Sequence, residues 1–485
     1  MKRAFLIVVV LALLAGMLPG CAPAAQPTAA PQPTTAPAQA TKAPEATKAP
    51  EATKAPEATK APSTSGQPVK IDFWFAMSGK TGEAVQAMVK KFNESQNEVF
   101  VTATFQGTYD DEINKLKAGL QSKNVPAVVQ IYDLGTRLLT DLKVITPMQD
   151  FIDKEKFDIS DIEPNILNYY TVDGKLQSMP FNSSNPVLYY NKNMFKEANL
   201  DPEKPPRTWQ EVTEYSRKLT KKDASGKTIQ YGNSFAFYGW FVEQWLAVSG
   251  DYYCNNENGR KARATEATFN SPNAVALLEW WKSMIDEGIS QNLGRSTTDT
   301  KKAFDAGTIA MTLDSTAALR DRIDAAQGKF EVGVGFLPRR NEEDYKKSGT
   351  IIGGASLWIL NARPKEEQEA AWKFVKFMVS ADQQAFWHIN TGYYPVNAKG
   401  YNHPDDVAWR TKYPQFQVAI DQLHMAPKNN VTAGGLIGVF PEARQTVEKA
   451  VEAYVTGKIP TAKQALDEAA KSVTQSIQDY NDTVK

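Results

Sequence analysis

Apolar runs of strand length alternate with helical patterns over residues 70–133, and this alternation constrains the fold more than any other feature. The strand-like runs are residues 70–75, 99–105 and 127–133. Between them, apolar residues recur at helical spacing over residues 84–92 and 113–120. Strands that alternate with helices in this way predict an α/β sheet.

Polar side chains that suit a ligand site follow the ends of these and later strands. Tyr109 and Asp133 come soon after two of the strand-like runs, and the pair Ser183 and Ser184 follows Phe181. In an open α/β sheet, ligands bind in the crevice beyond the carboxyl ends of the strands. These positions therefore mark the region in which we expect a ligand.

The N-terminus has the pattern of a secreted protein that stays at the membrane. Lys2 and Arg3 precede an apolar run over residues 4–14, and the sequence Leu-Pro-Gly-Cys ends at Cys21. The charged start, the short apolar run and the small residue before cysteine resemble a bacterial lipobox. We expect residues 1–20 to be a lipoprotein signal peptide and Cys21 to carry the lipid. The alternative is a plain signal peptide in which Cys21 is incidental.

A low-complexity segment follows the cysteine. Residues 21–68 consist almost entirely of Ala, Pro, Thr, Lys, Glu and Gln, and the sequence EATKAP recurs from Glu45, Glu51 and Glu57. This composition provides no core and favours an extended chain. We expect a disordered tether between the membrane and the folded part.

The remaining residues, 69–485, are sufficient for two domains of ordinary size. With Cys21 acylated, Cys254 has no partner in the chain, so we expect packing and not a disulfide to stabilise the folded part. The chain holds 55 Lys and Arg against 55 Asp and Glu. This balance argues against a general nucleic-acid binder.

Motifs for nucleotide binding and for hydrolysis are missing from the sequence. Gly79, Lys80 and Thr81 end like a P-loop, but the first glycine of that motif would fall on Trp74. Only three histidines occur, and neither an HExxH nor a GxSxG motif is present. We expect no enzyme activity, no cofactor and no metal. A secreted hydrolase with paired carboxylates stays as an alternative, because the separation of two carboxylates depends on the fold.

The stretches with the most specific patterns are distributed over the chain after the tether. They read DFWFAMSGKTGEAVQAMVKKFN, QIYDLGT, PFNSSNPVLYYNKNMFKEANLDPEKPPRTWQE, AGTIAMT, GTIIGGASLWIL and WHINTGYYPV. Together they resemble the extracellular solute-binding proteins (family 1) of ABC importers, and among these the members that bind glycerol 3-phosphate. The resemblance implies a type II periplasmic-binding-protein fold, with two α/β lobes, hinge crossovers and a ligand cleft between the lobes.

The resemblance also implies how the chain divides between the lobes. Residues 69–179 and 315–353 would form the N-terminal lobe, and residues 180–314 and 354–485 the C-terminal lobe. Apolar residues at helical spacing after position 447 predict that helices complete the second lobe.

The ligand-binding positions implied by the resemblance match this sequence one by one. Those on the phosphate side are Ser184, Ser315, Gly354, Tyr393 and Arg444, and Tyr109 lies on the glycerol side. Asp133 stands where the family usually has glutamate. Phe237 stands where the family has a tryptophan that packs on glycerol, and Tyr238 and Trp240 lie close by.

The same residues suit a phosphate ester on chemical grounds. A phosphomonoester carries close to two negative charges and several strong acceptor oxygens. The hydroxyls of Ser184 and Ser315, the backbone N–H groups at Gly354 and the guanidinium of Arg444 would supply donors. Asp133 would repel the phosphate, so we expect it to accept hydrogen bonds from glycerol hydroxyls at the other end. Each residue also has a purely structural interpretation, such as a serine turn or a glycine bend.

We therefore expect a lipid-anchored solute-binding protein at the outer face of the cytoplasmic membrane. It would be a monomer that captures sn-glycerol 3-phosphate or a glycerophosphodiester such as glycerophosphocholine, and delivers it to an ABC permease. Phe237 would leave more room than tryptophan, and Tyr238 or Trp240 would face a quaternary ammonium. An oligosaccharide-binding protein of the same fold is the alternative.

Overall fold

The computed structural model describes residues 66–484, which lie in one compact unit, Ser65–Lys485. The predicted signal peptide, the lipid on Cys21 and nearly all of the predicted tether lie outside the described residues. The first strand begins at Val69, where we expected the folded part to begin.

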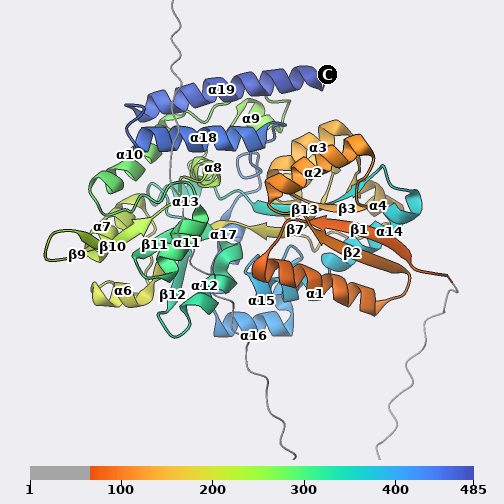
Figure 1. The fold of residues 1–485 in the computed structure, drawn as a ribbon, viewed down its shortest axis with the longest axis horizontal. Coiled ribbons are helices and arrows are strands. Elements are labelled where there is room, and N and C mark those ends of the chain that lie inside the picture. Colours follow the sequence, from red (N-terminus) through yellow and green to blue (C-terminus); the bar gives the residue numbers. More distant parts are fainter. Residues whose placement is uncertain (1–65, 485) are drawn as a thin grey trace, which may run out of the picture. The chain divides into compact units, whose positions relative to one another are not determined.

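The predicted strands belong to the first of two mixed sheets. Its strands are β1 Val69–Phe75, β2 Val99–Phe105, β3 Val128–Tyr132, β4 Ile145–Thr146, β7 Met179–Ser184 and β13 Gly353–Leu360. Their order is β2-β1-β3-β13-β4, and β7 pairs with β13 (Figure 1). β1 runs parallel to β2 and β3, whereas β13 runs antiparallel to β3, β4 and β7. The parallel part is the α/β unit that the sequence predicts.

A second sheet forms the other half of the folded part. Its strands are β8 Pro186–Asn191, β9 Lys221–Lys222, β10 Thr228–Ser234, β11 Ile309–Ser315 and β12 Val332–Phe336. Their order is β12-β8-β11-β10-β9. A small separate hairpin joins β5 Thr171–Val172 to β6 Lys175–Leu176.

Side chains of the first sheet alternate between two apolar cores. Val128 belongs to a core that includes α1 (Gly79–Ser95), and its neighbour Val129 belongs to a core that includes α2 (Tyr109–Ser122). Successive side chains of a strand point to opposite faces, so α1 and α2 cover opposite faces of the sheet. Figure 1 shows them on the two sides of β1 and β3.

The other helices complete both halves of the fold. They are α3 Thr136–Leu142, α4 Met148–Glu155, α5 Pro164–Tyr170, α6 Lys192–Glu197, α7 Trp209–Leu219, α8 Gly239–Val248, α9 Asn255–Gly259, α10 Pro272–Asp286, α11 Thr297–Asp305, α12 Leu319–Ala326, α13 Asp344–Lys347, α14 Lys365–Met378, α15 Ala381–Thr391, α16 Pro404–Lys412, α17 Gln415–Met425, α18 Phe440–Val455 and α19 Ala462–Thr483. Three 3-10 helices are η1 Asp133–Gly135, η2 Thr316–Ala318 and η3 Ala398–Asn402. α18 and α19 are the predicted C-terminal helices, and they pack against each other and against α10.

The strand pairings differ from the predicted lobe boundaries at three places. Residues 180–184 of β7 were predicted for the C-terminal lobe, but β7 pairs with β13 of the first sheet. β12 lies within residues 315–353, predicted for the N-terminal lobe, but it pairs with β8 of the second sheet. β13 lies largely within residues 354–485, predicted for the other lobe, but it pairs with β3 of the first sheet. The chain stays in the second sheet through β12 and returns only at β13, because β13 inserts antiparallel between β3 and β4. It leaves the first sheet after β7, so that only Asn185 separates the two sheets there.

Two further features concern the membrane and the thiol. Within residues 66–484, no helix is both long and apolar enough to cross a membrane. Cys254 is buried and free, and burial raises the pKa of its thiol to about 12. The thiol is therefore a protonated core group near neutral pH.

Gly354 occupies a conformation that glycine adopts without strain. Its φ is +106°, and a Cβ there would lie 1.9 Å from the carbonyl oxygen of Asn182. Its neighbour Gly353 pairs with Ser184 at the end of β7. The glycine therefore allows β13 to approach β7 closely, next to one of the predicted ligand residues.

Replacing Gly354 with alanine should lower the free energy of unfolding by about 2 to 4 kcal/mol, because it adds backbone strain and a contact with rigid backbone. Urea unfolding measures the loss. Gly457→Ala is the matched control, since Gly457 has a φ of +76° but nothing within 4 Å of an added Cβ. Equal losses in the two variants would contradict the close approach of β13 to β7.

Candidate functional site

One cavity of about 200 Å³ is lined by residues from both sheets. Seven of the eight ligand-binding residues predicted from the sequence line it, namely Tyr109, Asp133, Ser184, Ser315, Gly354, Tyr393 and Arg444. They stand at strand ends or helix starts, in α18, or, for Tyr393, just after the end of α15. The fold thus brings together residues that lie far apart in the sequence.

The two adjacent serines of β7 have different surroundings. Ser184 lines the cavity, whereas the hydroxyl oxygen of Ser183 is buried and has no hydrogen-bond partner among the described residues. Tyr394 fixes this end of the strand, because its phenol donates to the carbonyl of Ser184 over 3.1 Å. The alternation of side chains along a strand therefore leaves Ser184 as the serine that faces a ligand.

Ser315 ends β11 and begins η2. Its Oγ accepts a hydrogen bond from the N–H of Ala317 over 3.1 Å, so its own proton stays available for donation into the cavity. The preceding Asp314 also lines the cavity, but its carboxylate accepts from Arg322 over 2.5 Å. The negative charge of Asp314 is therefore balanced behind the cavity wall.

An aromatic wall stands beside the glycine pair. Trp240 lines the cavity, and a Cβ at Gly353 would lie 2.5 Å from its ring. The indole Nε1 of Trp240 is buried and has no hydrogen-bond partner within residues 66–484. Because a buried donor without a partner is costly, this N–H is a candidate for a hydrogen bond to a ligand.

The prediction that Phe237 lines the cavity is wrong. Phe237 is 1% exposed and packs edge-on against Trp281, with ring centroids 5.4 Å apart. Its neighbour Tyr238 lines the cavity instead. Tyr238 has extended backbone before α8, so consecutive side chains point in opposite directions. Tyr238 and Trp240 therefore provide the aromatic wall that we assigned to Phe237.

Arg444 is held by two carboxylates. Its Nε and Nη2 donate to the two oxygens of Glu243 over 2.7 and 2.8 Å, and Nη2 lies 3.6 Å from Oδ2 of Asp133. Burial acts to lower the pKa of Arg444, but Glu243, Tyr238 and Asp133 together outweigh burial and hold that pKa well above its ordinary value. The guanidinium is therefore charged, but one edge of its fork is already occupied.

The negative charge of Asp133 is disfavoured by burial in the cavity. Burial raises the pKa of Asp133 to about 7; Arg444 opposes the rise, and Glu243 adds to it. Near neutral pH the carboxyl group is thus partly protonated, and it can both donate and accept hydrogen bonds.

Tyr109 is positioned by a stack and a polar chain. Its ring lies parallel to that of Tyr132, with centroids 5.1 Å apart. Asn182 donates to its phenol oxygen over 3.0 Å, and Gln130 donates to Asn182 over 2.8 Å. Burial, followed by the nearby Tyr393, raises the pKa of Tyr109 well above its usual range. The phenol therefore stays protonated and can donate to a ligand.

A second cavity of about 480 Å³ adjoins the first. The two share Tyr132, Tyr238, Thr297 and Arg444 in their linings. The second cavity adds two carboxylates, Asp110 and Glu448, and one further cation, Arg295, which lies 3.3 Å from Glu452. A ligand in the first cavity would thus have beside it a space that contains aromatic rings, two carboxylates and two arginines.

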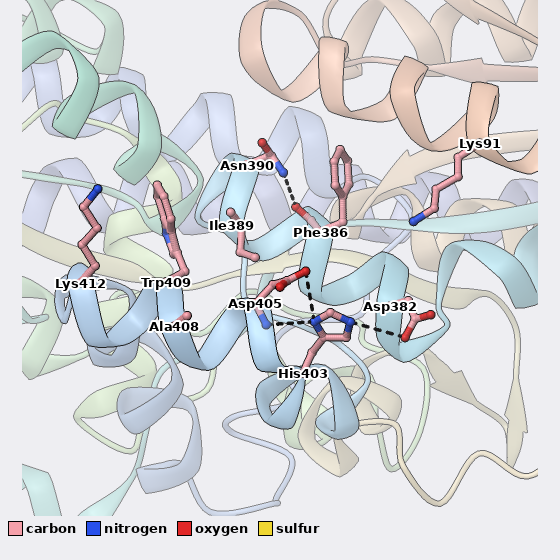
Figure 2. A pocket seen from close by; sticks show the side chains of 10 residues that line it. All are labelled: Lys91, Asp382, Phe386, Ile389, Asn390, His403, Asp405, Ala408, Trp409 and Lys412. Atoms are coloured by element: carbon pink, nitrogen blue, oxygen red, sulfur yellow. Dashed lines mark hydrogen bonds and ion pairs between the residues drawn. The ribbon is translucent and has the colours of Figure 1, made fainter. Parts of the chain in front are cut away.

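A larger cavity of about 610 Å³ lies elsewhere, along α15 and α16 (Figure 2). Phe386 and Trp409 are part of its lining, Lys91 and Lys412 lie at opposite ends, and His403 lies between two carboxylates at 3.8 Å. Its polar groups do not converge on one point, and none of the predicted ligand residues lines it. In the described part of the chain, no group of three His, Cys, Asp or Glu residues could hold a metal ion.

Sequence reasoning missed Glu243, and it assigned the tryptophan position to the wrong residue. Glu243 is the single charged residue of α8, whose ten residues are all buried. A lone charge in an apolar helix signals a buried partner. That signal was present, but it does not identify Arg444 as the partner.

Comparisons with known proteins show the family of the chain. Residues 87–417 match the family model of the bacterial extracellular solute-binding proteins. The sn-glycerol-3-phosphate-binding periplasmic protein UgpB of Escherichia coli (strain K12) is 33% identical over 420 residues, which cover 86% of this chain and 94% of that protein. UgpB of Shigella flexneri serotype 5b (strain 8401) gives the same identity and coverage.

Solved structures show the same fold at lower identity. UgpB from Mycobacterium tuberculosis in complex with glycerophosphocholine matches with a TM-score of 0.71 and 21% identity, over 86% of this chain and 99% of that one. The cyclic alpha-maltosyl-1,6-maltose binding protein from Arthrobacter globiformis matches with a TM-score of 0.68 and 22% identity, over 85% and 100%. These matches confirm the predicted two-lobed α/β fold. The chain therefore belongs to the bacterial extracellular solute-binding proteins, the family that serves ABC importers.

Proposed function

We propose that this protein captures a glycerol phosphate ester, either sn-glycerol 3-phosphate or a glycerophosphodiester such as glycerophosphocholine, and delivers it to an ABC permease. One observation carries the proposal: seven residues expected around such a ligand line a single cavity. The 33% identity to proteins named for binding sn-glycerol 3-phosphate supports it.

The cavity offers donors for the phosphate and further polar groups for the glycerol hydroxyls. The hydroxyls of Ser184 and Ser315 and the backbone at Gly354 would donate to phosphate oxygens, and Arg444 would add a charged donor. Asp133 and Tyr109 would contact the glycerol hydroxyls, with Trp240 as the apolar wall. Because these residues come from both sheets, ligand binding would favour the conformation in which the two lobes are together.

The adjoining cavity supports a diester as ligand. A substituent on the phosphate would extend past Arg444 into the space lined by Tyr238, Asp110 and Glu448. A quaternary ammonium is attracted to aromatic faces and to carboxylates. Glycerophosphocholine carries such a quaternary ammonium, whereas the monoester would leave this space empty.

We also propose that the protein is attached to the outer face of the cytoplasmic membrane through a lipid on Cys21, with residues 21–68 as the tether, and that it acts as a monomer. Replacing Cys21 with serine should move the protein from the membrane fraction to the soluble fraction, because the lipid is the membrane anchor. Ligand affinity should be unchanged, since the cavity lies within residues 109–444. Retention of the variant in the membrane fraction would contradict the anchor.

Isothermal titration tests the proposal most simply. Glycerol 3-phosphate, glycerophosphocholine and maltotriose are titrated into the soluble protein, and release of choline is followed in parallel. We expect one phosphate ester bound per chain, with no heat from maltotriose and no released choline. Binding of maltotriose alone would favour the oligosaccharide alternative, and released choline would favour the hydrolase.

The adjacent serines provide a matched pair of variants. Ser184→Ala removes a donor to phosphate and should weaken binding of glycerophosphocholine by about fivefold to a hundredfold, because a hydrogen bond to a charged group contributes roughly 1 to 3 kcal/mol. Ser183→Ala makes the same change one residue away, where the hydroxyl does not line the cavity. Titration should give the Ser183 variant the affinity of the wild type. Equal losses would remove Ser184 from the site.

We expect the carboxyl group of Asp133 to lower the free energy of unfolding while it contributes to ligand binding. Its pKa is about 7 in the folded protein against an ordinary 3.8, so above pH 4 the unfolded chain loses a proton that the folded protein keeps. The resulting cost grows between pH 4 and pH 7 and is complete above pH 7.

Asp133→Asn should therefore raise the free energy of unfolding at pH 8, by up to about 4 kcal/mol, and leave it nearly unchanged at pH 4. The same variant should bind glycerophosphocholine more weakly. Urea unfolding at the two pH values and titration at pH 8 measure both effects. A variant that is less stable than the wild type at pH 8 would show that Asp133 serves the fold.

A further inference from the structure

Arg444 lines the cavity, and its positive charge is balanced by Glu243, which lies outside the cavity lining. Glu243 accepts hydrogen bonds from Nε and Nη2 over 2.7 and 2.8 Å, and the side chains of Glu243 and Arg444 are 5% and 7% exposed. Glu243 itself does not line the cavity. It therefore acts on a ligand only through the guanidinium that it holds.

The pairing of Glu243 with Arg444 determines the net charge of the groups that surround a ligand in the first cavity. Arg444 is the one cation in the described lining of the first cavity. Asp314 is paired with Arg322, and Asp133 adds a second carboxyl group on the cavity side of Arg444. The cavity consequently offers hydrogen-bond donors without an excess of positive charge.

Phosphate esters differ in the charge that such a cavity must accept. A monoester carries between one and two negative charges near neutral pH and approaches two above its second pKa of about 6. A diester carries a single charge at all these pH values. In a buried site, one uncompensated charge costs far more than it does in water.

We propose that Glu243 is a specificity-determining residue that neutralises Arg444 and so selects singly charged phosphodiesters over doubly charged phosphomonoesters. The inference rests on the proposed function and identifies the ligand class within it. The carboxylates Asp110 and Glu448 in the adjoining cavity act in the same direction, since they favour a substituent with a positive charge.

The test compares two ligands on four proteins at pH 8, where glycerol 3-phosphate is doubly charged. The proteins are the wild type, Glu243→Gln, Glu243→Asp and the control Glu163→Gln, and the quantity is the ratio of the affinities for glycerophosphocholine and glycerol 3-phosphate. Glu163 is a carboxylate of similar burial that pairs with His424 and lines neither cavity.

The wild type should bind the diester more tightly. Glu243→Gln removes one negative charge at constant size, so it should shift the ratio toward the monoester by at least about fivefold. Glu243→Asp keeps the charge and should keep the preference, although it alters the packing. Glu163→Gln should leave the ratio unchanged.

Three results would overturn the inference: a wild type that prefers the monoester, an unchanged ratio in Glu243→Gln, or equal shifts in the Gln and Asp variants, which would indicate packing alone. A wild type that binds neither ester would contradict the proposed function itself.

A second measurement needs no variant and applies even if Glu243→Gln does not fold. Between pH 5 and pH 8 the charge of glycerol 3-phosphate doubles, whereas that of glycerophosphocholine stays constant. Titration of Asp133 affects the binding of both ligands, so the ratio of the two affinities is compared and not either affinity alone. The wild type should lose affinity for the monoester relative to the diester as the pH rises. A constant ratio would contradict selection by charge.

Discussion

Strand β13 is the element on which the rest of the site depends. It pairs with β3, β4 and β7, and so connects the parallel part of the first sheet to the strand from which the chain crosses to the second. Gly353 and Gly354, at its start, pair with the two serines of β7, and Gly353 lies against the ring of Trp240. Asp133 follows β3, which also pairs with β13, so the same strand brings its carboxyl group into the cavity that Ser184 lines.

Local sequence pattern was sufficient for the α/β class and for the strands β1, β2 and β3. Tyr109, Asp133 and Ser184 also lie at or soon after strand ends, where ligands of such sheets bind. The other predicted lining residues were implied by the family resemblance that the specific motifs carry. The division of the chain between lobes required long-range pairing. The local pattern of residues 332–336 does not indicate that they pair with β8. The pattern of residues 353–360 likewise does not indicate that they insert between β3 and β4.

The same limit applies at the level of side chains. Phe237 and Tyr238 are adjacent aromatics, and which one faces the cavity depends on the backbone direction before α8. The sequence shows Glu243 as a single charge in an apolar helix. Its partner lies on α18, about two hundred positions later in the sequence. Interactions between distant helices are set by packing, which the sequence pattern does not encode.

The central claim is that the phosphate of a glycerol phosphate ester lies between β7, β11 and β13. A crystal structure of the complex with glycerophosphocholine tests it most directly. The account predicts that the phosphorus atom lies within hydrogen-bonding range of Ser184, Ser315 and the backbone at Gly354, with glycerol toward Asp133 and choline toward Tyr238. Ligand density in the cavity of Phe386 and Trp409, or in the first cavity with choline toward Asp133, would contradict it.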